Sequence, residues 1–137
     1  MKLGRVLIAG VVVTIFNTAF AMLTCGWLFR WVYTLEPTNI WKSIDNFPWP
    51  VYYVSALILT IIFALVYALS NKGVPGKNRF VKGIVFGLCA WAVGMLPGMF
   101  ATYFFMTTNP GVVLYWTILG LVQTPMAGLI VAAIYGE

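Results

Sequence analysis

The chain has 137 residues, of which 62% are hydrophobic, 17% aromatic and only 8% charged, and its net charge is +5. A soluble domain carries about 25% charged residues because its surface has to be solvated. This composition therefore excludes a water-soluble globule and predicts an integral membrane protein. The sequence has no histidine, the usual general base and metal ligand near neutral pH, and its only acids are Glu36, Asp45 and Glu137.

The apolar residues form four long runs without a charged residue in the interior of any of them. About 20 helical residues cross the ~30 Å hydrocarbon core, whereas the strands of a membrane barrel show about 10 residues of alternating polarity. The first run is longer than the apolar region of a signal peptide, which has about 7–15 residues. We predict a single all-α transmembrane domain over 1–137, an integral membrane four-helix bundle with helices over about 6–28, 51–69, 81–106 and 112–135.

The loops between these runs predict the orientation. Six of the eight Lys and Arg residues precede the first helix or lie around the loop 71–80, and the other two lie in the outer interfacial segment, about 29–49. Because short loops rich in Lys and Arg stay in the cytoplasm, we expect a multi-pass protein of the cell inner (cytoplasmic) membrane with both termini cytoplasmic. The basic residues are not clustered among aromatic ones, so we expect no nucleic-acid partner.

Aromatic residues mark the opposite boundary, because amphipathic rings favour the headgroup level. The segment 27–47 is expected to lie along the outer surface, with a short helix beginning near Pro37, a residue type that suits a first helical turn. The simplest interpretation is an aromatic belt, and the alternative is a docking surface for a partner. The outer interfacial tryptophans are Trp27, Trp31, Trp41, Trp49 and Trp116.

Small residues recur at helical spacing along the third and fourth helices. Such residues let helix backbones approach closely in lipid, where the hydrophobic drive between helices is lost. Their spacing leaves open whether one of the small faces points to a second protomer. The predicted helix-packing residues are Gly83, Gly87, Gly94, Gly98, Gly120 and Gly128.

A few polar residues fall near the middle of the bilayer. At 1.5 Å per residue, Asn17 lies about 18 Å above Arg5, and Gln123 lies about 18 Å above Tyr135. An unpaired amide in hydrocarbon costs several kcal/mol, so these groups should face the bundle interior. They form either a polar site or pathway, or interhelical hydrogen bonds that contribute about 0.6–2 kcal/mol each. The candidate polar mid-membrane cluster is Asn17, Thr60, Gln123 and Thr124.

Prolines and cysteines add two further expectations. Pro97 and Pro125 remove backbone donors, so each should interrupt or curve its helix. Cys25 lies about 30 Å above Arg5 and Cys89 about 10 Å above Lys82. Since a disulfide needs Cα atoms within about 7 Å, the two cysteines should not pair.

The two halves of the chain resemble each other, and several segments resemble other proteins. Residues 5–10 align with 82–87, each with a basic residue, an apolar run and a glycine. This pattern fits two repeated helical hairpins related by an axis along the membrane normal, or chance similarity among apolar helices. Segments 3–10, 62–69, 74–76, 82–87 and 127–136 are similar to a broad group of small, uncharacterised prokaryotic four-helix integral membrane proteins. The resemblance implies a four-helix topology and supplies no catalytic residue.

Two functional hypotheses follow from these patterns. The first is a non-catalytic membrane subunit that scaffolds or stabilises a larger membrane assembly. The second is a small oligomeric channel or facilitator that uses the polar residues at mid-depth. We expect no enzymatic activity, no cofactor and no bound metal. The expected partners are the lipid bilayer together with other membrane protein subunits or a second copy of the chain.

Overall fold

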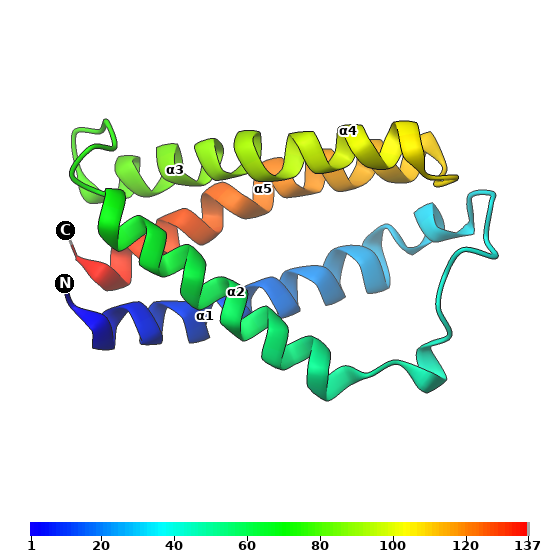
Figure 1. Cartoon of the computed structure of the whole chain (residues 1–137), viewed down its shortest axis with the longest axis horizontal. Helices are drawn as coiled ribbons and strands as arrows, with labels where there is room; N and C mark the ends of the chain where they lie inside the picture. Colours follow the sequence, from blue (N-terminus) through cyan, green and yellow to red (C-terminus); the bar gives the residue numbers. More distant parts are fainter. Residues whose placement is uncertain (137) are drawn as a thin grey trace.

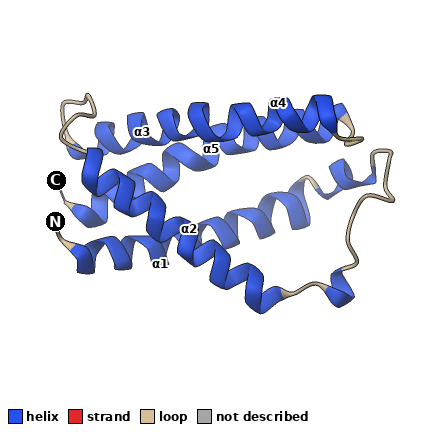
Figure 2. Cartoon of the chain, in the orientation of Figure 1, coloured by secondary structure: helices blue, strands red, loops and turns tan. Residues whose placement is uncertain are grey.

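The computed structural model describes residues 1–136, and within them it contains four helical spans and no strand (Figure 2). The spans are Leu3–Leu28, Trp49–Ser70, Arg79–Phe105 and Pro110–Tyr135, and each is long and apolar enough to cross a membrane. Their bounds differ from the predicted ones by at most three residues. The all-α, four-helix prediction is therefore confirmed, as is the multi-pass character of the chain.

Two of the four spans contain a change of helix type. The first span consists of α1 (Leu3–Leu23) and a π turn, η1 (Thr24–Leu28), and is followed by the short 3₁₀ helices η2 (Arg30–Thr34) and η3 (Ile44–Asn46). The second span is α2 (Trp49–Ser70). The third consists of α3 (Arg79–Ala90), a π turn η4 (Trp91–Met95) and α4 (Leu96–Phe105), and the fourth is α5 (Pro110–Tyr135).

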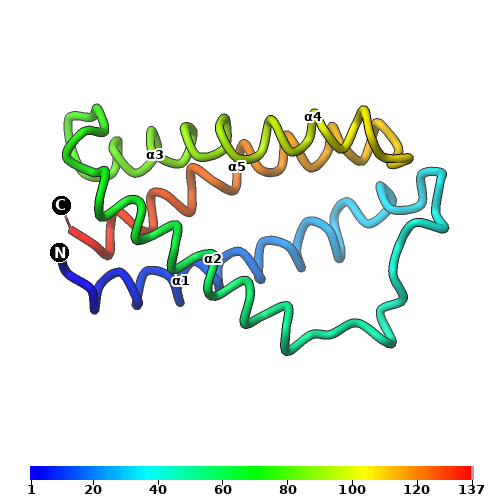
Figure 3. Tube along the Cα trace, viewed as in Figure 1, coloured from blue at the N-terminus to red at the C-terminus, as the bar shows by residue number. Residues whose placement is uncertain are grey.

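Both chain termini lie at one end of the molecule, which we call the terminal end, and the outer interfacial segment lies at the far end (Figure 1). The α3 helix packs along α5, and α1 contacts both α2 and α5. Figure 3 shows that α2 crosses α1 and diverges from the other helices toward its first residue, Trp49. The bundle is therefore closed at the terminal end and more open at the far end.

The helix ends follow local chemistry. The Asn78 side chain accepts a hydrogen bond from the backbone N–H of Val81 (3.0 Å), and that of Asn109 accepts one from Gly111 (2.8 Å). Both asparagines thereby satisfy a donor that the first helical turn leaves free. At the other end of α5, Gly136 has φ +82°, a left-handed conformation that favours glycine and ends the helix.

Basic side chains close two helix C-termini at the terminal end. The Arg5 guanidinium donates to the carbonyl oxygen of Tyr135 at the end of α5 (3.0 Å). The Lys82 ammonium donates to the carbonyl oxygen of Asn71, just past α2 (3.1 Å). Cations at these positions satisfy free carbonyls and complement the helix dipole.

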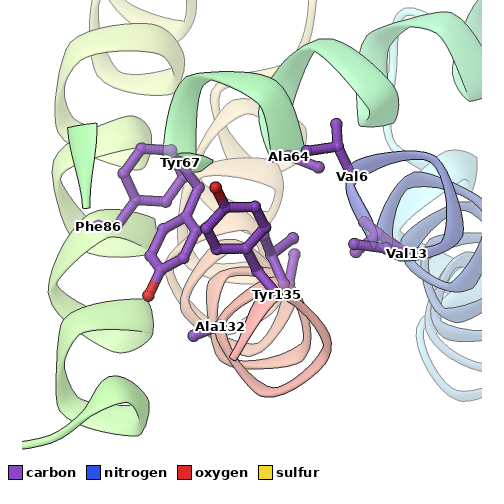
Figure 4. Packing of buried hydrophobic residues seen from close by; sticks show 10 residues of the cluster. Val6, Val13, Ala64, Tyr67, Phe86, Ala132 and Tyr135 are labelled. Carbon is purple, nitrogen blue, oxygen red and sulfur yellow. The ribbon is translucent and has the colours of Figure 1, made fainter. Parts of the chain in front are cut away.

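The hydrophobic core lies in the terminal half of the bundle (Figure 4). Tyr67 is fully buried there, and its ring centroid lies 5.2 Å from that of Phe86 and 6.2 Å from that of Tyr135. Small and branched residues of α1, α2 and α5 fill the space around these rings. The buried residues of this cluster are Val6, Ala9, Val13, Ala64, Tyr67, Phe86, Ala127, Val131, Ala132 and Tyr135.

Glycines set the close approach of α3 to α5. A β-carbon on Gly83 would lie 2.5 Å from the carbonyl oxygen of Gly128, and one on Gly87 would lie 2.5 Å from the carbonyl oxygen of Thr124. Both distances are far below van der Waals contact. Gly120 adjoins Met95 instead, since its β-carbon would lie 2.7 Å from the sulfur of that residue. Four of the six predicted packing glycines therefore contact a neighbouring helix.

The other two predicted packing glycines, Gly94 and Gly98, contact no other helix of the described chain. A β-carbon on either would meet no atom of the described chain within 4 Å, and both residues are exposed. The cause is the π turn, in which the N–H of Leu96 bonds to the carbonyl of Trp91. One extra residue in a turn displaces the following residues by about 100° around the axis. Pro97, as predicted, marks this interruption, and the displaced face turns away from α5.

The outer segment also differs from its prediction. Its short helices cover Arg30–Thr34 and Ile44–Asn46, and none begins near Pro37. Pro37 instead lies in a loop, after a cis peptide bond to Glu36. The carbonyl of Glu36 accepts a hydrogen bond from the Asn109 side chain (2.7 Å), so the loop is held against the start of α5. Tertiary contacts, rather than the local preference of proline, decide its conformation.

Candidate functional site

The two amides predicted at mid-depth are in direct contact. The Gln123 Nε2 of α5 donates to the Asn17 Oδ1 of α1 at 2.9 Å. Both side chains are partly buried, in a part of the bundle where α1 and α5 pack together. The pair therefore links two helices in the middle of their spans. This is the kind of interhelical hydrogen bond that polar residues form within lipid.

The Thr60 hydroxyl of α2 binds to α1 instead of joining the amide pair. Its Oγ1 lies 2.6 Å from the Oγ1 of Thr14 and 2.9 Å from the carbonyl oxygen of Gly10. Both contacts form if Thr14 donates to Thr60 and Thr60 donates to the carbonyl. The approach is close because Gly10 has no side chain: a β-carbon there would lie 2.5 Å from the Cγ1 of Ile61. Thr14 was not in the predicted cluster, although its position one turn after Gly10 was a usable signal.

A cavity of about 270 Å³ brings all four predicted residues together between α1, α2 and α5. Apolar side chains form the rest of its wall. On the terminal side it ends at Val13 and Ala127, which also belong to the buried core. The residues that line the cavity are Val13, Asn17, Leu59, Thr60, Phe63, Gln123, Thr124 and Ala127.

The chemistry available in this cavity is hydrogen bonding. Its polar groups are amides and hydroxyls, which do not ionise near neutral pH, and none of the lining residues is charged. Across residues 1–136, no group of three or more Cys, Asp or Glu side chains is close enough to hold a metal ion. The cavity can therefore orient an uncharged polar molecule, but it offers no general acid, base or nucleophile for a reaction on that molecule.

A second group of predicted residues assembles at the far end. The Trp116 Nε1 donates to the hydroxyl of Tyr33 (2.9 Å), and the Trp41 ring packs edge-on against both, with centroids at 5.9 and 5.2 Å. The Tyr115 hydroxyl lies 3.6 Å from the sulfur of Cys25. Burial raises the pKa of Tyr33, and the neighbouring Cys25 thiol raises it further. We call Tyr33, Trp41, Tyr115 and Trp116 the outer aromatic cluster; it holds the outer segment on α5.

The other three predicted tryptophans lie outside this cluster. Trp49 stacks on Tyr53, with ring centroids 5.9 Å apart, at the beginning of α2. Trp27 and Trp31 are 71% and 61% exposed. The five tryptophans thus share the far end of the molecule, where the sequence places the membrane boundary, and a pocket of about 550 Å³ lies between Trp41 and Trp49.

Both cysteines of the chain are free, as predicted. Another residue that the sequence did not single out joins α3–α4 to α5: the Trp91 Nε1 donates to the carbonyl oxygen of Thr117 (3.0 Å). A tryptophan N–H in the middle of a membrane span needs an acceptor, and this need was the available signal.

Comparisons of the chain with protein-family models, with curated proteins and with solved structures found no match. The resemblance to small four-helix membrane proteins therefore stays a prediction. The function has to be argued from the cavity, the helix faces and the outer segment alone.

Proposed function

We propose that this protein is a non-catalytic membrane subunit that scaffolds or stabilises a larger membrane assembly through the side of its third span. The observation that carries this proposal is the displaced face of Gly94 and Gly98. Within the described chain a β-carbon on either glycine meets no atom within 4 Å. Small residues on a lipid-facing surface let another helix approach closely, and that approach provides much of the association energy within a bilayer.

Two further features support an accessory role. On the side of α4 that faces α5, away from the two glycines, a groove of about 460 Å³ is lined by apolar and aromatic residues such as Met99, Phe100 and Leu114. The outer segment adds exposed rings at the far end, among them Trp27 and Trp31.

We place the protein in the cell inner membrane with the terminal end in the cytoplasm. The basis is the distribution of charge. Six of the eight Lys and Arg residues lie near the N-terminus or around the loop 71–80, and both of these are at the terminal end of the molecule (Figure 1). Lys and Arg in short loops are retained on the cytoplasmic side. In this orientation the outer aromatic cluster and the outer segment face the opposite leaflet.

The alternative of a channel receives less support. A path through one chain would have to continue from the mid-depth cavity to the terminal end. That half of the bundle is filled by the buried core around Tyr67. A pore would therefore have to run between copies of the chain, and the experiment below also tests this arrangement.

The test is purification in mild detergent from the native membrane, comparing the wild type with the double variant Gly94→Leu, Gly98→Leu. We expect stoichiometric unrelated subunits with the wild type and their loss with the variant, whose side chains enter open space and leave the fold intact. The control is Gly26→Leu. A β-carbon at Gly26 also meets no atom within 4 Å, but this glycine lies in η1 of the first span, away from the third.

Three results would contradict the proposal. The first is a lone monomer from the wild type. The second is equal recovery of the partner subunits with the double variant and with the control. The third is a homo-oligomer that carries solute flux in liposomes, a result that would support the channel instead.

A further inference from the structure

The mid-depth cavity contains more hydrogen-bonding capacity than the described chain uses. The Asn17–Gln123 pair forms one N–H···O bond, and a single such bond between two primary amides leaves three N–H groups and one carbonyl oxygen without a partner. Among residues 1–136, these groups make no other hydrogen bond, and neither does the Thr124 hydroxyl. All of them belong to residues that line one cavity of about 270 Å³.

Groups of this kind cannot face hydrocarbon without a large cost. The bilayer core contains no water that could satisfy their hydrogen bonds. If Asn17, Gln123 and Thr124 served only to pack the helices together, leucine or alanine would suffice at these three positions. Thr60 illustrates the contrast, because its hydroxyl is buried and contacts both Thr14 and the backbone of Gly10. The amide pair and Thr124, by contrast, retain donors and an acceptor that point to an occupant of the cavity.

The charge of the cavity restricts that occupant. None of its eight lining residues is ionisable within the physiological range. An ion at the middle of a membrane is compensated by opposite charges or by a water-filled path, and the buried core closes the terminal side. The occupant should therefore be neutral. The occupant also has to be small, because the cavity measures about 270 Å³. For scale, one molecule in liquid water takes about 30 Å³.

We propose that this cavity is a binding site for a small uncharged molecule that both donates and accepts hydrogen bonds, of the primary-amide class. The unused carbonyl oxygen accepts from the amide N–H₂ of the guest, and the N–H groups of the pair donate to the guest's carbonyl. Thr124 provides a further hydroxyl at the wall. This inference does not depend on the scaffold function, since it concerns the interior of the bundle and not the face of Gly94 and Gly98.

The test uses acetamide as the probe and the purified full-length chain in detergent micelles. Saturation-transfer difference NMR reports transfer from the protein to the acetamide methyl group, and urea serves as a competitor. Two variants alter the cavity in different ways. Thr124→Val removes a hydroxyl that bonds to no other described residue. Leu59→Trp narrows the cavity from a rim position that is 64% exposed, so neither change should prevent folding.

Each variant has a matched control that leaves the cavity unchanged. Thr102→Val removes the same hydroxyl from a half-buried position on α4 outside the cavity, where it bonds to the Gly98 carbonyl of its own helix. Ile58→Trp adds the same ring to the neighbouring residue of α2, which is 53% exposed and does not line the cavity. Circular dichroism establishes that all four proteins retain the helical content of the wild type.

We expect acetamide to bind the wild type and both controls, with urea as a competitor. Because Thr124→Val removes one hydrogen bond, it should lower the affinity for acetamide about threefold to tenfold. Leu59→Trp should lower that affinity at least as much. No transfer to acetamide in the wild type would overturn the proposal. So would equal transfer in all five proteins, which would show binding to the micelle or to the protein surface. If Thr124→Val fails to fold, the comparison of Leu59→Trp with Ile58→Trp decides.

Discussion

The crossing of α3 and α5 makes the strongest quantitative prediction, because only one of two glycines in the same span lies against another helix. In Gly83→Ala the new methyl group lies 2.5 Å from the carbonyl oxygen of Gly128 and 2.7 Å from the Cβ of Ala132. In Gly94→Ala it meets no described atom within 4 Å. Replacing glycine by alanine inside an α-helix gains about 0.8–1 kcal/mol of helix propensity, which applies to Gly83 in α3, whereas Gly94 lies in the π turn η4. The clash at Gly83 has to exceed this gain to appear as a loss of stability.

Overpacking a close contact by one methyl group costs about 1–3 kcal/mol. We expect Gly94→Ala to be as stable as the wild type or more stable, and Gly83→Ala to lie about 1–3 kcal/mol below Gly94→Ala. The measurement is equilibrium unfolding in mixed micelles of dodecyl maltoside and sodium dodecyl sulfate, followed by far-UV circular dichroism. Equal stability of the two variants would refute the reasoning, since it would mean that α3 and α5 are not held together at Gly83 and Gly128.

Two more predictions concern hydrogen bonds, and a third concerns the pKa of Tyr33. Thr60→Val removes the hydroxyl that joins α2 to Gly10 and should cost about 0.6–2 kcal/mol in the same unfolding assay, whereas Thr60→Ser should recover most of that loss. Asn17→Leu and Gln123→Leu should each destabilise the protein, but the double variant should lose less than the sum of the two, because neither amide is then left unpaired; additive losses would contradict the contact. Burial raises the pKa of Tyr33 above its usual 10.0, so its neutral form stabilises the folded state fully below about pH 10 and this stabilisation is lost as the pH rises through the raised pKa. Near-UV circular dichroism of the docked outer segment should show that alkaline loss in the wild type, and Tyr33→Phe should lack it.

Residue depth could be predicted from the sequence, but the direction in which each residue faces could not. Counting 1.5 Å per residue placed Asn17 and Gln123 at the same level, and they are hydrogen-bonded at 2.9 Å. The same count placed Thr60 at that level, yet it binds the backbone of Gly10. Depth depends only on position along a helix. The partner depends on how each helix is rotated about its axis, and that rotation is set by packing against the other three.

The direction in which Gly94 and Gly98 face could not be predicted from the sequence for a related reason. A regular α-helix puts Gly83, Gly87, Gly94 and Gly98 on one side, because these spacings are close to whole turns. The π turn at Trp91–Met95 breaks that regularity. Pro97 was a signal for an interruption, but nothing in the sequence states whether the chain responds with a bend or with an extra residue in the turn. In the structure the turn places both Trp91 and Met95 against Gly120 of α5.

The outer segment was the least predictable part. Its position at the membrane boundary follows from its aromatic residues, but its conformation depends on distant groups, such as Asn109, which binds the carbonyl of Glu36 across 73 positions of sequence. The suggested hairpin repeat likewise stays a prediction. Alignment of 5–10 with 82–87 does not determine how the two halves are related in space.

The size of the residues at the helix contacts explains why the helices lie close together in the terminal half and farther apart toward the far end. In the terminal half, Gly10, Gly83 and Gly128 let backbones meet directly, and the core around Tyr67 is filled. Toward the far end the contacts pass through larger side chains, such as Met95 and Trp91 against Gly120, and they hold the helices farther apart. Grooves of about 460 and 220 Å³ lie along this wider part, and the cavity of about 270 Å³ lies at its border with the core. At the terminal end a hollow of about 430 Å³ lies at the surface, beside Lys2 and Lys72. Replacing the glycines of the closed half should therefore lower the free energy of unfolding, whereas replacing residues that line the cavities should change binding with less effect on that free energy.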